Sequence, residues 1–275
     1  MEGGAMRGLF TAGVLDVFME NNIEFACAVG VSAGAAFGCN YKSHQIGRAL
    51  RYNLRYCKDK RYCSVHSLIK TGDMFGAEFC YHTLPEKLDK FDTQTYDNSP
   101  MPFYAVCTDV ISGKAVYHLC DKANYETYEW IRASASMPLV SNIVKIGDSL
   151  LLDGGIADSI PLSFMENEGY TKNVVILTQP KNYVKGENKL MPLIKMRLKK
   201  YPNFVKAVEN RHIVYNKTVR YIKQQEALGK AFVIRPPESL PIGKTEHNPE
   251  KLQKVYEIGR QTALSRLDEL IEFIN

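Results

Sequence analysis

Residues 25–37 read Phe25-Ala26-Cys27-Ala28-Val29-Gly30-Val31-Ser32-Ala33-Gly34-Ala35-Ala36-Phe37. The first half is an apolar run of strand length, and the small apolar residues after the serine favour a buried helix. A strand that turns through Gly-x-Ser-x-Gly directly into a helix is typical of α/β proteins. This segment therefore predicts an α/β fold with Ser32 on a tight turn between a strand and a helix.

Ser32 is the first candidate for a functional residue. Gly30 and Gly34, with Val31 and Ala33 between them and the serine, would let the chain turn sharply and present the hydroxyl. The N-terminal end of the following helix favours negative charge that develops at this position. We therefore predict a nucleophilic serine on an elbow; the alternative is a serine that only caps the helix.

Strands alternate with helices along the rest of the chain. We expect strands at residues 103–108, 115–118, 143–146, 149–152, 173–178 and 231–234. We expect helices from Leu9 to near Asn21–Asn22, at 125–134, in two basic segments broken near Pro202, and from Asn248 to about Ile274. Residues 42–100 are mostly helical and polar. This order predicts one α/β domain spanning residues 1–275.

Asp153 is the second candidate, because it follows the apolar strand and precedes Gly154 and Gly155. α/β proteins build their sites at the C-terminal ends of strands, and the glycines permit a close approach of the backbone. We expect Asp153 to be the partner of Ser32. An Asp-Gly pair is by itself also a common turn.

The third candidate is a glycine-rich loop at the start of the chain, Gly3-Gly4-Ala5-Met6-Arg7-Gly8. Successive N–H groups in such a loop can bind an anion, as an oxyanion hole requires, and Arg7 adds positive charge. The missing Lys-Ser/Thr pair disfavours a nucleotide-binding P-loop, while a simple turn remains an alternative.

The six histidines show no flanking pattern that marks a catalytic base. In an ordinary α/β-hydrolase the serine elbow comes after several strands, and Asp and His follow it. Ser32 has room for only one or two strands ahead of it. This order disfavours a Ser-His-Asp hydrolase, in which His212 or His247 would act as the base.

Composition narrows the class of protein. The 275 residues carry a net charge of +5, and no run of about 18 apolar residues or secretory signal is present. Seven cysteines without a CxxC pair are typical of reduced thiols in a cytoplasmic protein and give no support to a metal site. Residues 189–230 hold eleven Lys and Arg against two Glu, a net charge of +9. This asymmetry suggests an anionic partner surface, but no motif supports nucleic-acid binding.

Together and in this order, the three motifs resemble the patatin-like phospholipases. That family has a Gly-Gly-Gly-x-Arg-Gly loop, a Gly-x-Ser-x-Gly elbow and an Asp-Gly-Gly/Ala motif. The segment Ala133-Ser134-Ala135-Ser136-Met137-Pro138 and Pro161 also look like the family. The resemblance covers about residues 1–180 and is strongest to bacterial, cytoplasmic-type members.

The resemblance implies a three-layer α/β/α fold with a central, mostly parallel sheet. The catalytic core would span about residues 1–180, with a basic helical and C-terminal helix region at about 185–275. It also implies a Ser32–Asp153 dyad, an oxyanion hole from Gly3, Gly4, Ala5 and Arg7, and no cofactor or metal. The implied activity is hydrolysis of lipid acyl esters, as in a phospholipase A, lysophospholipase or carboxylesterase. A non-catalytic lipid-binding module of the same fold is the competing interpretation.

The sequence departs from the family pattern at two places. Ala5 stands for the third glycine of the loop, and we expect this to be tolerated because the backbone N–H remains. The family also has an apolar strand before the loop, for which Met1 leaves no room, so we expect the natural start about ten residues upstream.

Two segments are candidates for contact with lipid. Residues 42–100 are the expected cover over the site, where Arg48, Arg51 and Arg55 share one helical face. The later basic stretch interleaves its charges with apolar residues, which are Leu193, Ile194, Met196, Leu198, Phe204 and Val208. Such a pattern suits peripheral contact with an anionic membrane surface. The alternative is an apolar face packed on the core with solvated lysines outside.

Overall fold

The computed structural model describes residues 1–275. The strands are β1 (Ala28–Val31), β2 (Phe103–Asp109), β3 (Ala115–Leu119), β4 (Val144–Ile146), β5 (Ser149–Asp153), β6 (Asn173–Ile176) and β7 (Ala231–Ile234). The α-helices are α1 (Gly8–Glu20), α2 (Ala33–Lys42), α3 (Arg48–Tyr56), α4 (Val65–Thr71), α5 (Thr93–Asn98), α6 (Tyr125–Ser134), α7 (Leu162–Asn167), α8 (Met191–Arg197), α9 (Pro202–Ala227), α10 (Pro249–Leu264) and α11 (Leu267–Ile274). Shorter elements are the 3₁₀ turns η1 (Ala5–Arg7) and η3 (Gly154–Ile156) and the π-helix η2 (Phe79–Leu88).

The strands form two sheets. β1 pairs with β2 in parallel, β2 pairs with β3 and β5 in antiparallel, β4 pairs with β5, and β6 and β7 form a separate parallel pair.

The segment Met1–Gly3 lies between β1 and β6 and joins the two sheets. The Val31 N–H donates to the Met1 carbonyl at 3.2 Å, and the Glu2 N–H donates to the Ile176 carbonyl at 2.9 Å. The Thr178 hydroxyl donates to the Gly3 carbonyl at 2.8 Å. The segment Met1–Gly3 runs parallel to both neighbouring strands, because residue numbers increase in the same direction along the segment, β1 and β6. Strands β1, β2, β6 and β7 therefore run in one direction, and the sheet is mostly parallel.

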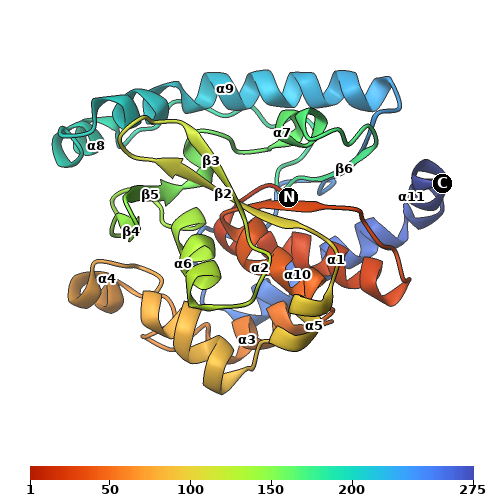
Figure 1. Ribbon diagram of the computed structural model, residues 1–275, viewed down its shortest axis with the longest axis horizontal. Coiled ribbons are helices and arrows are strands. Elements are labelled where there is room, and N and C mark those ends of the chain that lie inside the picture. Colours follow the sequence, from red (N-terminus) through yellow and green to blue (C-terminus); the bar gives the residue numbers. More distant parts are fainter.

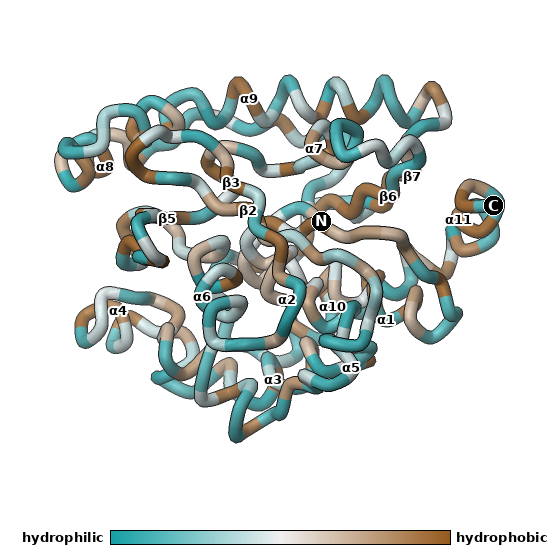
Figure 2. The backbone as a smooth tube through the Cα atoms, in the orientation of Figure 1, coloured by the Kyte–Doolittle hydropathy of each residue, from teal (hydrophilic) through white to brown (hydrophobic).

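Helices cover both faces of this sheet, which gives the three-layer α/β/α architecture that the family resemblance implied (Figure 1). Successive side chains of β7 point alternately into the two cores that lie on opposite faces of the sheet. Ala231 and Val233 join the core beneath α9, whereas Phe232 and Ile234 join the core formed with α1 and α10. A strand buried on both faces needs such a continuous apolar run. Hydrophilic residues predominate along the outer helix α9 (Figure 2).

Most expected elements lie where the sequence placed them, but two differ. The strand expected from Phe25 begins only at Ala28, because Ala28 pairs with Phe103, the first residue of the neighbouring β2. The single C-terminal helix expected up to Ile274 is broken after Leu264 into α10 and α11. There, Arg266 leaves helical geometry, and its guanidinium donates to the Val233 carbonyl at 2.7 Å and covers the Phe232 ring.

The segment 42–100 is helical, as predicted, and contains only an isolated bridge between Cys63 and Phe75. The seven cysteines form no disulfide. None of the helices has both the length and the apolar composition that a membrane crossing requires.

Candidate active site

Ser32 occupies the turn between β1 and α2 with φ 56° and ψ −121°. A positive φ is unfavourable for a residue with a side chain, and such strain persists only where the surroundings enforce it. The flanking glycines are part of that enforcement. A Cβ on Gly34 would lie 2.6 Å from the Met1 carbonyl oxygen, and one on Gly30 would clash with the backbone of Gly34 and Ala35.

Asp153 ends β5 and lies beside the serine. The Ser32 hydroxyl donates to Asp153 Oδ2 at 2.9 Å, and the Gly155 N–H donates to Asp153 Oδ1 at 2.7 Å. The Thr108 hydroxyl donates to the Asp153 carbonyl at 2.8 Å, which fixes the backbone as well. Ser32 and Asp153 are only 7% and 5% exposed, so this hydrogen bond is buried.

Burial raises the pKa of the Asp153 carboxyl above its usual range. The Arg211 guanidinium, the Gly155 N–H and the Ser32 hydroxyl act in the opposite direction but do not cancel the effect of burial. A carboxylate with a raised pKa is a stronger base than an exposed aspartate.

The backbone of Ser32 is held by a residue to which the sequence assigned no role. The Ser32 N–H donates to Ser134 Oγ at 2.9 Å, and the Ser134 hydroxyl donates to the Val106 carbonyl at 2.6 Å. Ser134 lies in the segment 133–138, so its motif was visible in the sequence although its contact was not.

The glycine-rich loop passes directly over the serine. A Cβ on Gly3 would lie 2.8 Å from Ser32 Cβ. The N–H groups of Gly3, Gly4 and Ala5 donate no hydrogen bond within the chain, so they are free to bind an anion. Ala5 has φ 51°, a conformation that a glycine adopts with less strain.

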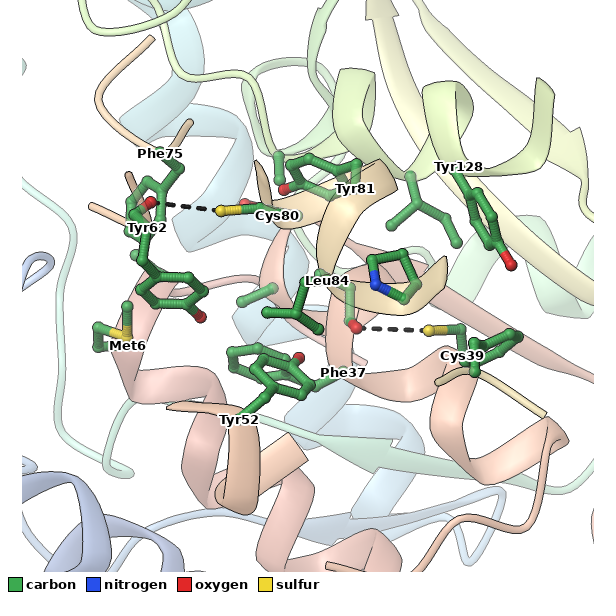
Figure 3. Close-up of a pocket in the computed structure, with 18 of the residues that line it drawn as sticks. Met6, Phe37, Cys39, Tyr52, Tyr62, Phe75, Cys80, Tyr81, Leu84 and Tyr128 are labelled. Atoms are coloured by element: carbon green, nitrogen blue, oxygen red, sulfur yellow. Dashed lines mark hydrogen bonds between the residues drawn. The ribbon is translucent and has the colours of Figure 1, made fainter. Parts of the chain in front are cut away.

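Ser32 lines two cavities. The first has a volume of about 100 Å³ and is apolar, and Figure 3 shows aromatic and aliphatic side chains pointing into it. Several of them come from the segment 42–100: Tyr52, Tyr62, Phe75, Cys80, Tyr81 and Leu84. The expected cover over the site is therefore present.

The second cavity is wider, about 780 Å³, and polar. Asp153 and the glycine-rich loop with Arg7 line it. Four further cations also line it: Lys185, Lys189, Arg211 and Lys244. They come from three separate segments, and the only signal in the sequence was the excess of positive charge in residues 189–230.

The remaining predicted residues of the elbow and of the Asp-Gly-Gly motif lie around this site, whereas neither candidate histidine is hydrogen-bonded to Ser32 or Asp153. Val31 ends β1, Ala33 lines the apolar cavity, and Gly154 begins η3. His212 lines the wide cavity, but its Nδ1 faces the Glu209 carbonyl, and His247 Nδ1 faces the Cys57 carbonyl. Neither ring forms a hydrogen bond with Ser32 or Asp153.

The chain resembles proteins of several organisms. It is 28% identical to the uncharacterized protein YjjU of Escherichia coli (strain K12), over 94% of this chain and 73% of that protein. It is 24% identical to lysophospholipase NTE1 of Chaetomium globosum, over 61% of this chain but only 11% of that protein. An uncharacterized NTE family protein of Mycobacterium bovis is also 24% identical, over 58% of this chain and 42% of its own length.

Two family models match separate parts of the chain. Residues 201–275 match a model described as a domain of unknown function. Residues 1–165, which include the loop, the elbow and Asp153, match the model described as patatin-like phospholipase. This chain belongs to the patatin-like phospholipase family.

Proposed function

We propose that this protein is a serine hydrolase of lipid acyl esters, of the phospholipase A, lysophospholipase or carboxylesterase type. The observation that carries the proposal is the buried hydrogen bond of 2.9 Å from the strained Ser32 to Asp153. The fungal relatives named lysophospholipases support a lipid substrate.

The first half of the reaction acylates Ser32. Asp153 accepts the hydroxyl proton as Ser32 Oγ attacks the ester carbonyl carbon. The free N–H groups of Gly3, Gly4 and Ala5 stabilise the oxyanion that forms. The C–O bond to the alcohol then breaks, and the proton on Asp153 passes to the departing alkoxide.

The second half releases the acid. Asp153, again ionised, takes a proton from a water molecule that attacks the acyl carbonyl, and the same N–H groups hold the second oxyanion. The bond to Ser32 Oγ breaks, and the serine regains its proton from Asp153. No histidine is needed, because Asp153 contacts Ser32 directly.

The two cavities give the substrate an orientation. The acyl chain occupies the apolar cavity beneath the cover, where its burial is favourable. The alcohol part of the ester faces the wide, polar cavity, through which water also enters.

Peripheral contact with an anionic membrane surface forms part of the proposal and rests on α8. Leu193 and Met196 on this helix are 45% and 66% exposed. The flanking cations form no ion pair: Lys189, Arg197, Lys199 and Lys200. Exposed apolar residues among free cations suit the headgroup region of an anionic bilayer.

Most of the other basic and apolar residues considered for lipid contact are already engaged, and only Arg55 on α3 is exposed without an ion pair. Ile194, Leu198, Phe204 and Val208 are buried in the core, as the alternative interpretation predicted. Arg48 and Arg51 on α3 both pair with Asp89. Membrane contact is therefore assigned to α8 and its neighbours, where exposed apolar side chains accompany the free cations.

The test is release of fatty acid from lysophospholipid and monoacylglycerol micelles. We expect turnover by the natural chain and a loss of at least about a hundredfold in Ser32→Ala and Asp153→Asn, as removal of a nucleophile or base requires. Ser112→Ala, in an exposed turn, is the matched serine control. Substrate binding without turnover by the folded natural chain would favour the lipid-binding interpretation instead.

A further inference from the structure

The wide cavity beside Ser32 contains an unusual concentration of positive charge. Arg7 reaches it from η1, Lys185 from the loop after β6, Arg211 from α9 and Lys244 from the loop before α10. Four separate segments thus contribute cations to the same cavity, and the loop after β6 adds the exposed Lys189 as well.

Arg211 lies beside Asp153. A Cβ on Gly155 would be 2.9 Å from Arg211 Nη2 and 3.0 Å from Asp153 Oδ1. The absence of a side chain at Gly155 therefore gives the guanidinium its place next to the carboxylate. A ligand group held by Arg211 would lie adjacent to the scissile ester.

None of the four cations is neutralised by the protein. They form no ion pair, and the Nε atoms of Arg7 and Arg211 are buried without a hydrogen-bond partner. An unmade hydrogen bond of a buried donor costs free energy. A bound anion would remove this cost at both guanidinium groups.

The buried acidic groups of the cavity are already occupied. The Glu2 carboxylate accepts hydrogen bonds from the Thr178 N–H at 2.6 Å and the Tyr215 hydroxyl at 2.7 Å. Asp153 is engaged by Ser32 and Gly155. Glu187, which also lines the cavity, is exposed and forms no ion pair. The Glu2 and Asp153 carboxylates offset part of the positive charge, but neither forms an ion pair with any of the four cations.

The pKa values of the two lysines are lowered first by burial and then by the neighbouring cations. Burial, followed by repulsion from Arg211, lowers the pKa of Lys185 to about 8, although Glu2 raises it. Partial desolvation and repulsion from Arg211 and Arg7 also lower the pKa of Lys244, while Asp153 raises it. Lys185 Nζ lies 4.3 Å from the centre of the Tyr215 ring, which orients it in the cavity.

We propose that Arg7, Lys185, Arg211 and Lys244 form a subsite for the phosphate of the substrate's head group, and that the enzyme prefers lipids with a dianionic phosphomonoester. Guanidinium groups bind phosphate oxygens in pairs, and the lysines supply point charges. With the acyl chain in the apolar cavity, the phosphate lies on the opposite side of Ser32. The assignment rests on the proposed function for the position of the ester.

The subsite gives the C-terminal part of the chain a role in substrate selection. Arg211 and Lys244 lie within residues 201–275, which match the domain of unknown function, and Lys185 lies between the two matched regions. Only Arg7 belongs to the part that matches the patatin-like phospholipase model. The catalytic pair and most of the head-group contacts thus come from different parts of the chain.

Binding to the Ser32→Ala chain tests the subsite without turnover. The probes are a short-chain lysophosphatidic acid and the monoacylglycerol with the same acyl chain, measured by calorimetry below their micellar concentrations. We expect the phosphate lipid to bind at least tenfold more tightly. Adding Arg211→Gln should remove about tenfold of that affinity, as the loss of one charged hydrogen-bonding group predicts, and leave monoacylglycerol binding within about twofold. Arg220→Gln, exposed on the same helix, should change neither affinity.

The possible outcomes separate this subsite from the proposed function. Phosphate preference that Arg211→Gln abolishes supports the subsite even if the natural chain hydrolyses no ester, which would overturn only the function. Hydrolysis without phosphate preference, or preference unaffected by Arg211→Gln, overturns the subsite and leaves the function intact. Inorganic phosphate should compete only weakly. If it binds as tightly as the phosphate lipid, the site binds free phosphate and the head-group assignment is wrong.

Discussion

Ser32 and Asp153 are 121 residues apart in the chain, yet the serine hydroxyl donates to the carboxylate at 2.9 Å. Strand β2 brings them together, because it pairs with β1 on one side and with β5 on the other. Val31, just before the serine, is opposite Val106, and Asp153 is opposite the next residue, Cys107. The register of one central strand therefore sets the geometry of the pair.

Asp153→Asn should abolish activity without lowering stability. Because the folded pKa of Asp153 is raised, the folded state holds its proton to higher pH than the unfolded state does. Stability contributed by this group is therefore lost as pH rises from the unfolded pKa of about 4 towards the folded value. At pH 7 the neutral asparagine avoids this penalty.

Thermal unfolding checks this prediction. The melting temperature of Asp153→Asn at pH 7 should equal or exceed that of the natural chain, and the difference should shrink at about pH 4. A variant that melts clearly below the natural chain at pH 7 would show that the ionised carboxylate stabilises the fold.

The decrease of kcat/KM at low pH should follow the protonation of the Asp153 carboxylate. The reaction needs ionised Asp153, so the midpoint of kcat/KM should lie above the value of about 4 for an ordinary aspartate. Arg211 lowers the pKa of Asp153, so Arg211→Gln should shift this midpoint to higher pH. A neutral monoacylglycerol substrate avoids titration of the substrate, and Arg220→Gln serves as the control. An unchanged midpoint in Arg211→Gln would contradict the electrostatic coupling.

Relief of backbone strain at Ser32 should be measurable. Ser32→Gly and Ser32→Ala both remove the hydroxyl, but only glycine accepts φ 56° without cost. We expect Ser32→Gly to be more stable than Ser32→Ala by about 1 kcal/mol in urea unfolding. Equal stabilities would mean that the elbow is not strained.

Membrane contact should depend on the exposed face of α8. The double variant Leu193→Glu/Met196→Glu should bind vesicles of phosphatidylcholine and phosphatidylglycerol at least tenfold more weakly, since burial of one such side chain contributes about 1.5–3 kcal/mol. Leu228→Glu, equally exposed at the far end of α9, is the control. If Leu228→Glu weakened vesicle binding as much as the double variant does, α8 would not be the contact surface.

Much of the fold was predictable because its signals are local. Glycines around Ser32 and after Asp153, the apolar strands and the proline at the start of α10 all act within a few residues. The break between α10 and α11 was not predictable, because no proline or glycine marks it. It depends on Arg266 reaching β7, a contact between distant segments.

Only part of the candidate site was predictable from the sequence. The sequence predicted Ser32, Asp153 and the loop, and the structure brings these residues together. The sequence alone could not assign a contact to Ser134, and it could not place Lys185, Arg211 and Lys244 in one cavity. Those positions follow from the packing of α9 and two loops around the sheet, for which a single sequence carries no signal.

The central claim is that Ser32 is an activated nucleophile whose base is Asp153. The most direct measurement is the intact mass of the protein after treatment with a long-chain alkyl fluorophosphonate. We predict one adduct on the natural chain, located on Ser32 by peptide mapping, and none on Ser32→Ala or Asp153→Asn. A folded natural chain that forms no adduct, or an Asp153→Asn variant that reacts as fast as the natural chain, would contradict the claim.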